Sequence, residues 1–361
     1  MRIHKFTSSE FSCLKEEWQN LLYESSADRL FLSWHWMHSW WKVFGGKDND
    51  ELFILGVYTD NNQLIAIAPF YKSKRQIYKY YSTTVLQFIG TRLKGSFGFR
   101  TENLEFIQRN NCNHNAIEFI FNYIQKNVKI DELWLHDLVK GSETQKQLSL
   151  NCTKYSINKR VQSHEQAYGI DTTGSFDKYI SQLGKNTRLK FYNRRKILEE
   201  MGNVTAAEVN KNNYLEALSI LSKYHFTRWG HDISYKKHGV FIDRLISNNS
   251  SISVCGVFVK LNDVTIGCAL DFKVENTTYN IQSGFKDNIH KKIAMGSLTL
   301  GYLIEQYFND PKIIYYDFLA GAGKNSNYKE SISSPGVKVS TEQLILSKKV
   351  KFLYFIKDLI K

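Results

Sequence analysis

Residues 279–330 read YNIQSGFKDNIHKKIAMGSLTLGYLIEQYFNDPKIIYYDFLAGAGKNSNYKE and contain the pattern that decides the fold. Polar and apolar side chains alternate over residues 279–285, which is the period of a half-buried strand. Apolar residues recur at helical spacing over residues 298–308, and we interpret residues 312–318 as a second strand. The order is therefore strand, basic loop, helix, strand and glycine-rich loop.

The loop before this helix carries the residue types of an anion-binding site. Lys291 and Lys292 add positive charge close to the amino-terminal end of the helix, which is itself partially positive. Gly296 lets a ligand approach the backbone, and we expect Ser297 to be the N-cap, with the N–H groups of the first turn facing the ligand. A surface loop that only joins strand to helix fits the same pattern.

Length and composition favour a cytoplasmic protein of two domains. The chain has 361 residues, 42% of them hydrophobic, which is enough for a large core. We expect no transmembrane segment, because no apolar run approaches the roughly 18 residues that a membrane span needs. The first residues also lack the continuous apolar stretch of a signal peptide. Five scattered cysteines predict free thiols in a reducing compartment.

The formal net charge of +13 indicates an acidic partner, such as a phosphorylated cofactor, a nucleic acid or a membrane surface. The most basic segment is GKNTRLKFYNRRKILEEM, residues 184–201, which we interpret as one basic amphipathic helix. Such a helix face is often only solvated, and contact with phosphate or nucleic acid is the alternative. Its basic residues are Lys185, Arg188, Lys190, Arg194, Arg195 and Lys196.

The two halves of the chain share one plan. Each contains two apolar strands around a polar turn, followed by a helix and a further strand, and Gly56-Val57-Tyr58 matches Gly256-Val257-Phe258. The later strands also match, at Asp137 and Asp317. Duplication of one α/β module explains this order, and coincidence between two ordinary hairpins is the alternative. We therefore expect an α/β (α+β) fold.

Motifs of several enzyme classes are absent from the sequence. It contains no P-loop, no dinucleotide-binding glycine fingerprint and no zinc-binding His-Glu-x-x-His. It also lacks the Gly-x-Ser-x-Gly elbow of serine hydrolases, and its ten histidines show no metal-ligand spacing. We therefore expect neither a metalloenzyme, nor a P-loop enzyme, nor a classical serine hydrolase.

Six short motifs follow one another along nearly the whole chain. They are Phe31-Leu32-Ser33-Trp34-His35-Trp36, Leu64-Ile65-Ala66-Ile67-Ala68-Pro69, Arg188 with Arg194-Arg195, Tyr224-His225 with Arg228-Trp229, Gly284-Phe285-Lys286 with Gly296, and Asp317-Phe318-Leu319 and Gly321 with Tyr328-Lys329. Together they resemble the CelD-type branch of the GNAT acyltransferase superfamily, the cellulose- and capsule-associated acetyltransferases. That branch is related to the Fem-type aminoacyltransferases of peptidoglycan synthesis.

The resemblance implies two tandem GNAT-like domains, residues 1–165 and 166–361, each a mixed, mostly antiparallel sheet flanked by helices. It also implies a co-substrate, acetyl-CoA or another acyl-CoA, and the lack of metal-ligand spacing predicts no metal. The first half lacks glycine and paired lysines at residues 110–114, so we expect the cofactor only in the second domain. The implied contacts are Lys291, Lys292, Met295, Gly296 and Ser297 with the pyrophosphate, and the backbone at Gln282, Ser283 and Gly284 with the thioester.

Acyl transfer also needs a proton acceptor for the nucleophile and a proton donor for the leaving thiolate. The resemblance places Tyr328 near the thiolate as the candidate acid, with a packed loop tyrosine as the alternative. Asp317, at the end of a strand, is a candidate base or a cap for the glycine-rich loop. His225 is the second candidate base, or else a helix histidine bonded to a backbone carbonyl.

Three further residues are candidates for binding the acceptor. Arg228 and Trp229 offer a fixed charge for a carboxylate or phosphate and an aromatic face for a sugar, and a structural Trp–Arg stack is the alternative. Lys329 is assigned to an anionic group of the substrate, because a basic residue contacts a nucleotide-sugar diphosphate in Fem-type relatives.

The resulting hypothesis is a cytoplasmic N- or O-acyltransferase that acts on a sugar or amino-sugar intermediate of surface polysaccharide biosynthesis. The acceptor would be a small molecule or a nucleotide- or lipid-linked sugar. One alternative is a Fem-type transferase that uses aminoacyl-tRNA, which the basic segment would suit, although the sequence shows no long coiled-coil insertion. Another is a catalytically inactive GNAT-like scaffold.

Overall fold

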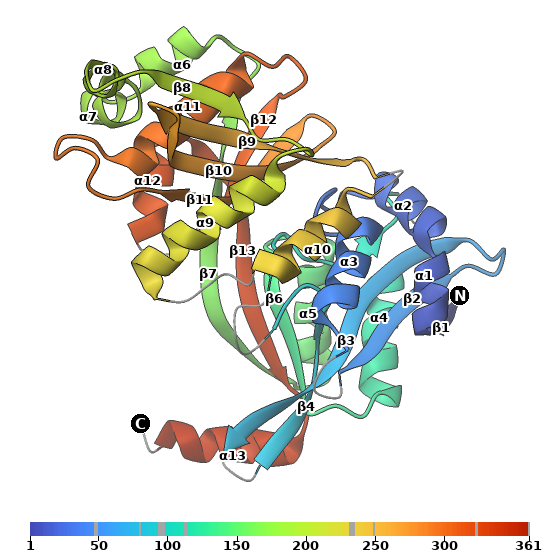
Figure 1. The fold of residues 1–361 in the computed structure, drawn as a ribbon. Helices are drawn as coiled ribbons and strands as arrows, with labels where there is room; N and C mark the ends of the chain where they lie inside the picture. Colours follow the sequence, from blue (N-terminus) through green and yellow to red (C-terminus); the bar gives the residue numbers. More distant parts are fainter. Residues whose placement is uncertain are drawn as a thin grey trace. The chain divides into compact units, whose positions relative to one another are not determined.

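The computed structural model comprises two compact units (Figure 1). The first unit contains residues 1–165 and 337–361, and the second contains residues 166–336. The sequence-based division assigns residues 337–361 to the second domain, whereas the structure groups them with the first. The residues that the structure describes are 1–46, 50–78, 81–92, 98–111, 115–230, 235–247, 250–321 and 324–359.

Antiparallel pairing connects strands β1 to β4 of the first unit in chain order, and β4 then pairs in parallel with β6. A parallel pair requires a crossover connection, which here contains helix α4. The elements are β1 (Arg2–Phe6), α1 (Ser8–Cys13), α2 (Lys15–Tyr23), α3 (Trp34–Phe44), β2 (Glu51–Tyr58), β3 (Leu64–Tyr78), β4 (Tyr81–Phe88), β5 (Ile107–Gln108), α4 (Ala116–Asn127), β6 (Glu132–Val139), α5 (Glu143–Lys154) and α13 (Lys348–Leu359).

The second unit repeats this arrangement. Strands β8 to β11 are antiparallel, and β11 pairs in parallel with β12 through a crossover that contains helix α11. The elements are α6 (Phe176–Gln182), α7 (Lys185–Arg188), the π-helical turn η1 (Leu189–Asn193), α8 (Arg195–Glu200), β8 (Val204–Glu208), α9 (Tyr214–Trp229), α10 (Tyr235–Leu245), β9 (Ile252–Leu261), β10 (Val264–Val274), β11 (Thr277–Phe285), α11 (Met295–Phe308), β12 (Tyr315–Gly321) and α12 (Lys324–Ile332).

The last strand of each unit comes from the other half of the chain. Strand β7 (Asn158–Asp171) pairs through residues 166–171 with β12, and β13 (Ser334–Ile345) pairs through residues 339–345 with β6. The strand orders are therefore β1-β2-β3-β4-β6-β13 and β8-β9-β10-β11-β12-β7. These matching orders confirm the shared plan of the two halves. The exchange of strands explains why residues 337–361 belong to the first unit.

A β-bulge marks the equivalent strands β6 and β12. In each bulge two residues oppose one on the partner strand, and the second of the two has a positive φ, Asp137 (45°) in β6 and Leu319 (60°) in β12. The bulges therefore make Asp137 equivalent to Leu319. The sequence match of Asp137 with Asp317 is wrong by two residues.

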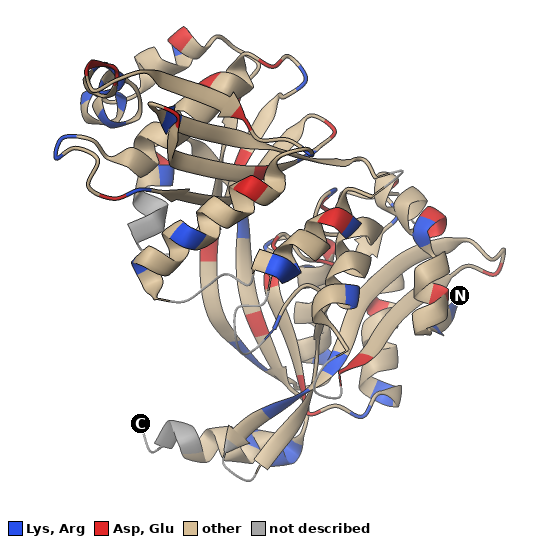
Figure 2. Cartoon of the chain, in the orientation of Figure 1, with Lys and Arg blue, Asp and Glu red and all other residues tan. Residues whose placement is uncertain are grey.

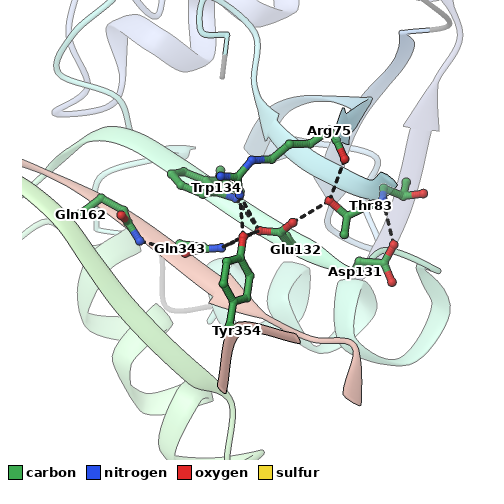
Figure 3. Close-up of polar contacts among 9 residues, drawn as sticks. Arg75, Thr83, Asp131, Glu132, Trp134, Gln162, Gln343 and Tyr354 are labelled. Carbon is green, nitrogen blue, oxygen red and sulfur yellow. Dashed lines mark hydrogen bonds and ion pairs between the residues drawn. The ribbon is translucent and has the colours of Figure 1, made fainter. Parts of the chain in front are cut away.

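A buried polar cluster fixes helix α13 to the first unit (Figure 3). The Tyr354 hydroxyl donates to Glu132 (3.1 Å) and accepts from Arg75 (2.7 Å) and Gln343 (3.0 Å). Arg75 also forms an ion pair with Glu132 at 3.1 Å, and Glu132 is fully buried. Because a buried carboxylate is costly without partners, this cluster holds the carboxyl-terminal segment in place.

Aromatic side chains dominate the core around the amino-terminal helices. Trp18, Trp36 and Trp40 are completely or almost completely buried, and Ser33 caps α3 by accepting the N–H of Trp36 at 3.1 Å. No helix in the described ranges is long and apolar enough to cross a membrane. The described cysteines are all free thiols, namely Cys13, Cys152, Cys255 and Cys268, whereas Cys112 lies outside the described residues.

The basic segment is not one helix. It forms α7, the π-helical turn η1 and α8, so the prediction of a single helix over residues 184–201 is wrong. In η1 the side chain of Phe191 is 3% exposed and belongs to the core of the second unit. Its carbonyl oxygen approaches α11 so closely that a Cβ at Gly301 would lie 1.8 Å from it. Packing against α11 therefore overrides the helical periodicity of this segment.

Candidate functional site

Helices α9 and α11 pack on opposite faces of the sheet in the second unit. A Cβ at Gly267 of β10 would lie 2.0 Å from Thr299 of α11, and a Cβ at Gly284 of β11 would lie 3.1 Å from Leu221 of α9. Gly284 pairs with Cys268, the neighbour of Gly267, so the two glycines face opposite sides of the sheet. Strand β11 therefore lies between the two helices.

Strands β11 and β12 separate after a short parallel pairing. Their last pair joins Tyr279 to Asp317, whereas β11 continues to Phe285 and β12 to Gly321. Residues 282–285 pair only with β10 among the described strands. Backbone groups of Gln282 to Gly284 therefore line an open strand edge, where a ligand can hydrogen-bond as a further strand would.

The equivalent gap in the first unit is closed by the chain itself. Strand β4 ends at Phe88, one residue after its last pair with β6. Leu104 then occupies the edge of β6, where its N–H donates to the carbonyl of Asp137 (2.9 Å) and its carbonyl accepts from the N–H of Val139 (3.0 Å). The two units therefore differ at the position where the second unit is open.

Helix α11 begins at Met295 without a side-chain cap. Ala294 occupies the N-cap position, so the prediction that Ser297 is the N-cap is wrong, and Ser297 lies inside the first turn. In contrast, Asn115 caps the equivalent helix α4 of the first unit. The uncapped N–H groups of the first turn of α11 are suited to an anion. Met295 is 3% exposed, so its backbone rather than its side chain would contribute.

Phe285, at the end of β11, connects the start of α11 with the end of α9. A Cβ at Gly296 would lie 2.5 Å from the Phe285 ring, so glycine there makes room for this ring. The Arg228 guanidinium lies 4.2 Å from the centroid of the same ring and donates to Asp287 at 2.9 Å. Trp229 is 64% exposed. Arg228 thus reaches the loop before α11 through Phe285, which belongs to one of the six motifs, and through Asp287, which the sequence motifs do not include.

The two lysines of the loop before α11 are exposed. The backbone N–H of Lys292 donates to Nδ1 of His290 at 3.2 Å, which stabilises a turn directly after that histidine. Figure 2 colours the Lys and Arg positions blue, including those along the loop that connects β11 with α11. Lys291 and Lys292 therefore place positive charge within a few residues of the uncapped helix start.

Lys329 and Asp317 both bind the backbone of the bulge in β12. The Lys329 side chain is buried and donates to three successive carbonyl oxygens, those of Phe318 (2.7 Å), Leu319 (2.9 Å) and Ala320 (3.1 Å). Asp317 Oδ1 accepts the N–H of Leu319 at 2.7 Å, which supports the capping alternative for this carboxylate. Together they hold the strained backbone of Leu319 where β12 separates from β11.

The two remaining candidates for proton transfer lie on different helices. Burial raises the pKa of Tyr328 in α12 to about 12, so its phenol is protonated at neutral pH and can donate. Its ring also packs against the core of the second unit, as the packed-tyrosine alternative requires. His225 in α9 is half-buried, with its ring 6.4 Å from that of Trp229.

Asp271 is a buried carboxyl group that the sequence analysis missed. It lies in β10, accepts from the Tyr307 hydroxyl of α11 (2.9 Å) and from the side-chain amide of Asn280 (2.9 Å), and is fully buried. Ile281 is the extra residue of a bulge in β11, and its N–H also donates to this carboxyl. Asp271 thus ties α11 to β11 beside the open edge. The sequence feature that could have revealed Asp271 is one acidic residue inside the apolar run CALDF.

The side chain of Arg195, in the basic segment, packs against α11 instead of projecting into solvent. It forms an ion pair with Glu305 of α11, its guanidinium lies 3.8 Å from the centroid of the Tyr302 ring, and its side chain is 11% exposed. We expect Arg195→Ala to lower the free energy of unfolding by about 2 kcal/mol in urea denaturation, because it removes packing and leaves Glu305 unpaired. Arg194→Ala is the control, with an expected loss below about 0.5 kcal/mol. Equal losses in the two variants would contradict this role.

No protein-family model matches the chain, and no curated protein matches it by sequence. Solved structures match nearly its whole length. FemX covers 98% of this chain and 99% of its own, with TM-score 0.61 and 12% identity. A tandem GNAT protein from the clavulanic acid biosynthesis pathway covers 96% and 98%, with TM-score 0.56 and 8% identity. The C-terminal domain of a putative lysylphosphatidylglycerol synthetase from Agrobacterium fabrum covers 98% and 97%, with TM-score 0.52 and 7% identity.

Identities this low establish similarity of fold alone. The matched structures cover both units of the chain, which share one strand order. The chain therefore has a mixed α/β fold that is similar over its whole length to the folds of FemX and of a tandem GNAT protein.

Proposed function

We propose that this protein is an acyl-CoA-dependent acyltransferase whose cofactor binds in the second unit. The observation that carries the proposal is the early end of the β11–β12 pairing, at Tyr279 and Asp317, beside the uncapped start of α11. The amide-rich arm of acyl-CoA can pair with the open edge, and its pyrophosphate can bind the helix N–H groups. The first unit has a closed edge and a capped helix, so we assign it a structural or substrate-side role.

The proposed reaction joins the acyl group to an amine or hydroxyl of the acceptor. The nucleophile attacks the thioester carbonyl carbon, a C–N or C–O bond forms, and the C–S bond breaks. Backbone N–H groups of Gln282 to Gly284 are assigned to the oxyanion. Tyr328 is assigned as the acid that protonates the thiolate, and either Asp317 or His225 accepts the proton of the nucleophile.

For the acceptor we propose a sugar or amino-sugar intermediate of surface polysaccharide biosynthesis. The support is the resemblance of the six motifs to CelD-type acetyltransferases, together with an exposed aromatic ring at Trp229 next to the charge of Arg228. The ammonium of Lys329 already donates to three carbonyls of β12. We therefore assign Lys329 to shaping the site instead of contacting the substrate.

Calorimetric titration with acetyl-CoA, CoA and tRNA tests this function. We expect acetyl-CoA and CoA to bind with one site per chain, and tRNA not to bind at physiological salt. The similarity to FemX also fits an aminoacyl-tRNA-dependent transferase. Salt-sensitive tRNA binding without CoA binding would replace our proposal with that one. Binding of neither ligand would favour an inactive scaffold.

The two loop lysines provide a direct test of the pyrophosphate assignment. We expect the double variant K291Q/K292Q to bind acetyl-CoA about tenfold more weakly at low salt, because two positive charges near the phosphates are lost. The difference should shrink as salt rises. The matched control is K185Q/K190Q, which removes two exposed lysines from α7 and η1. An equal loss in the control would show that only net charge matters.

A further inference from the structure

Helix α13 is apolar on two opposite faces. Val350 and Tyr354 are 0% and 4% exposed and pack with Ile345 in the first unit. Phe352 and Phe355 are 62% and 59% exposed. Because they are three positions apart in a helix, their rings lie on the same side, away from Val350 and Tyr354. Two large aromatic rings exposed side by side form an apolar patch, and such patches often mark an interaction site, so this outer face calls for an occupant.

The buried side of α13, with Val350 and Tyr354, fixes the orientation of the outer face. The Tyr354 hydroxyl is part of the buried cluster with Glu132 and Arg75 (Figure 3), and the guanidinium of Arg160 lies 4.6 Å from the centroid of its ring. The helix is thus anchored to the sheet of the first unit. It presents Phe352 and Phe355 on the surface of the first unit.

Lysines surround the two exposed rings. Lys348, Lys349 and Lys351 are all exposed, and no acidic residue occurs between residues 348 and 356. At about 100° per residue, Lys351 projects on one side of the Phe pair and Lys349 on the other, while Lys348 lies one turn before Phe352. In Figure 2 the Lys and Arg positions on the coloured part of α13 and on the neighbouring strands are blue. The outer face therefore combines two aromatic rings with three positive charges.

We propose that the outer face of α13 docks the protein on an anionic lipid surface. The Phe352 and Phe355 rings insert at the boundary between headgroups and acyl chains, and the three lysines contact anionic headgroups. A helix that exposes aromatic side chains with lysines on both sides of them is suited to a planar lipid interface. The charge complementarity favours a lipid surface over an apolar protein groove, which would leave the lysines unpaired.

Co-sedimentation with large unilamellar vesicles tests the proposal. The full chain is expected to bind vesicles of mixed phosphatidylcholine and phosphatidylglycerol, to bind less as salt rises, and to bind pure phosphatidylcholine poorly. F352S/F355S should lower the partition coefficient by at least about tenfold, because two apolar rings no longer enter the interface. K348Q/K349Q/K351Q should cause a similar loss at low salt.

Two matched controls distinguish binding through this face from non-specific hydrophobic or electrostatic adsorption to the vesicles. Leu150→Ser removes an apolar side chain of α5 that is equally exposed, at 61%, and K185Q/K190Q/K196Q removes three exposed lysines of the second unit. Both controls should bind vesicles like the unmodified protein. Thermal unfolding should be unchanged in F352S/F355S, since neither ring is buried.

Three results would overturn the proposal. They are absence of binding to the mixed vesicles, an equal loss in the control triple variant, and a Phe double variant that binds normally. Sedimentation velocity tests the other candidate partner for the outer face of α13, which is a second copy of the chain. A dimer that F352S/F355S converts to a monomer, with vesicle binding unchanged, would replace the lipid surface by self-association. Acetyl-CoA affinity should be the same in F352S/F355S as in the unmodified protein, so the outcome is independent of the proposed function.

Discussion

Gly301→Ala is expected to lower the free energy of unfolding by about 3 kcal/mol. The added Cβ would lie 1.8 Å from the carbonyl oxygen of Phe191, far inside van der Waals contact. Both partners belong to helical backbone, so no side-chain rotation relieves the clash. Either α11 or η1 therefore has to shift. This shift disrupts the packing of the core to which Phe191 belongs. Urea denaturation followed by circular dichroism measures the loss.

Gly174→Ala is the matched control for this experiment. A Cβ at Gly174 would meet no heavy atom within 4 Å, so we expect a change below about 0.5 kcal/mol. Acetyl-CoA titration of the folded Gly301→Ala protein adds a functional measurement, because a shifted α11 moves the uncapped N–H groups at its start. A Gly301→Ala protein as stable as the unmodified one would show that η1 and α11 do not approach as closely as the structure places them.

Asp271→Asn is expected to remove a large part of the pH dependence of stability. Burial raises the pKa of Asp271 to about 7, from the 3.8 of a solvent-exposed aspartate. Between these two values the folded state holds a proton that the unfolded chain releases, so stability falls as pH rises through this window. The fall is at most about 1.4 kcal/mol per pH unit and about 4 kcal/mol in total. Asparagine does not titrate, so the variant should gain by this amount relative to the unmodified protein between pH 4 and pH 8.

The control for loss of one acidic group is Asp263→Asn, in the exposed turn between β9 and β10. This variant should keep the pH slope of the unmodified protein. Free energies of unfolding are compared in urea at several pH values for all three proteins. Parallel curves for Asp271→Asn and the unmodified protein would be incompatible with a protonated carboxyl between β10, β11 and α11.

Local sequence patterns were sufficient for the elements of the candidate site. The alternation over residues 279–285 and the helical spacing over residues 298–308 correspond to β11 and α11, because both periods depend on neighbouring residues only. The two hairpins and their repeated order were also visible, and the strand orders of the two units confirm them. The helix start was misplaced, since Ser297 has the composition of a cap but Ala294 occupies that position.

The sequence by itself therefore determined the order of elements, the repetition of the module and the basic loop that distinguishes the second copy. Only the tertiary structure decided which strand completes each unit, because pairing of β7 with β12 and of β13 with β6 joins segments far apart in the chain. It also directed Lys329 to the carbonyls of β12 and Arg195 to Glu305, because a buried charge is stable only next to partners. The open edge of β11 is likewise tertiary, since it depends on where the pairing with β12 stops.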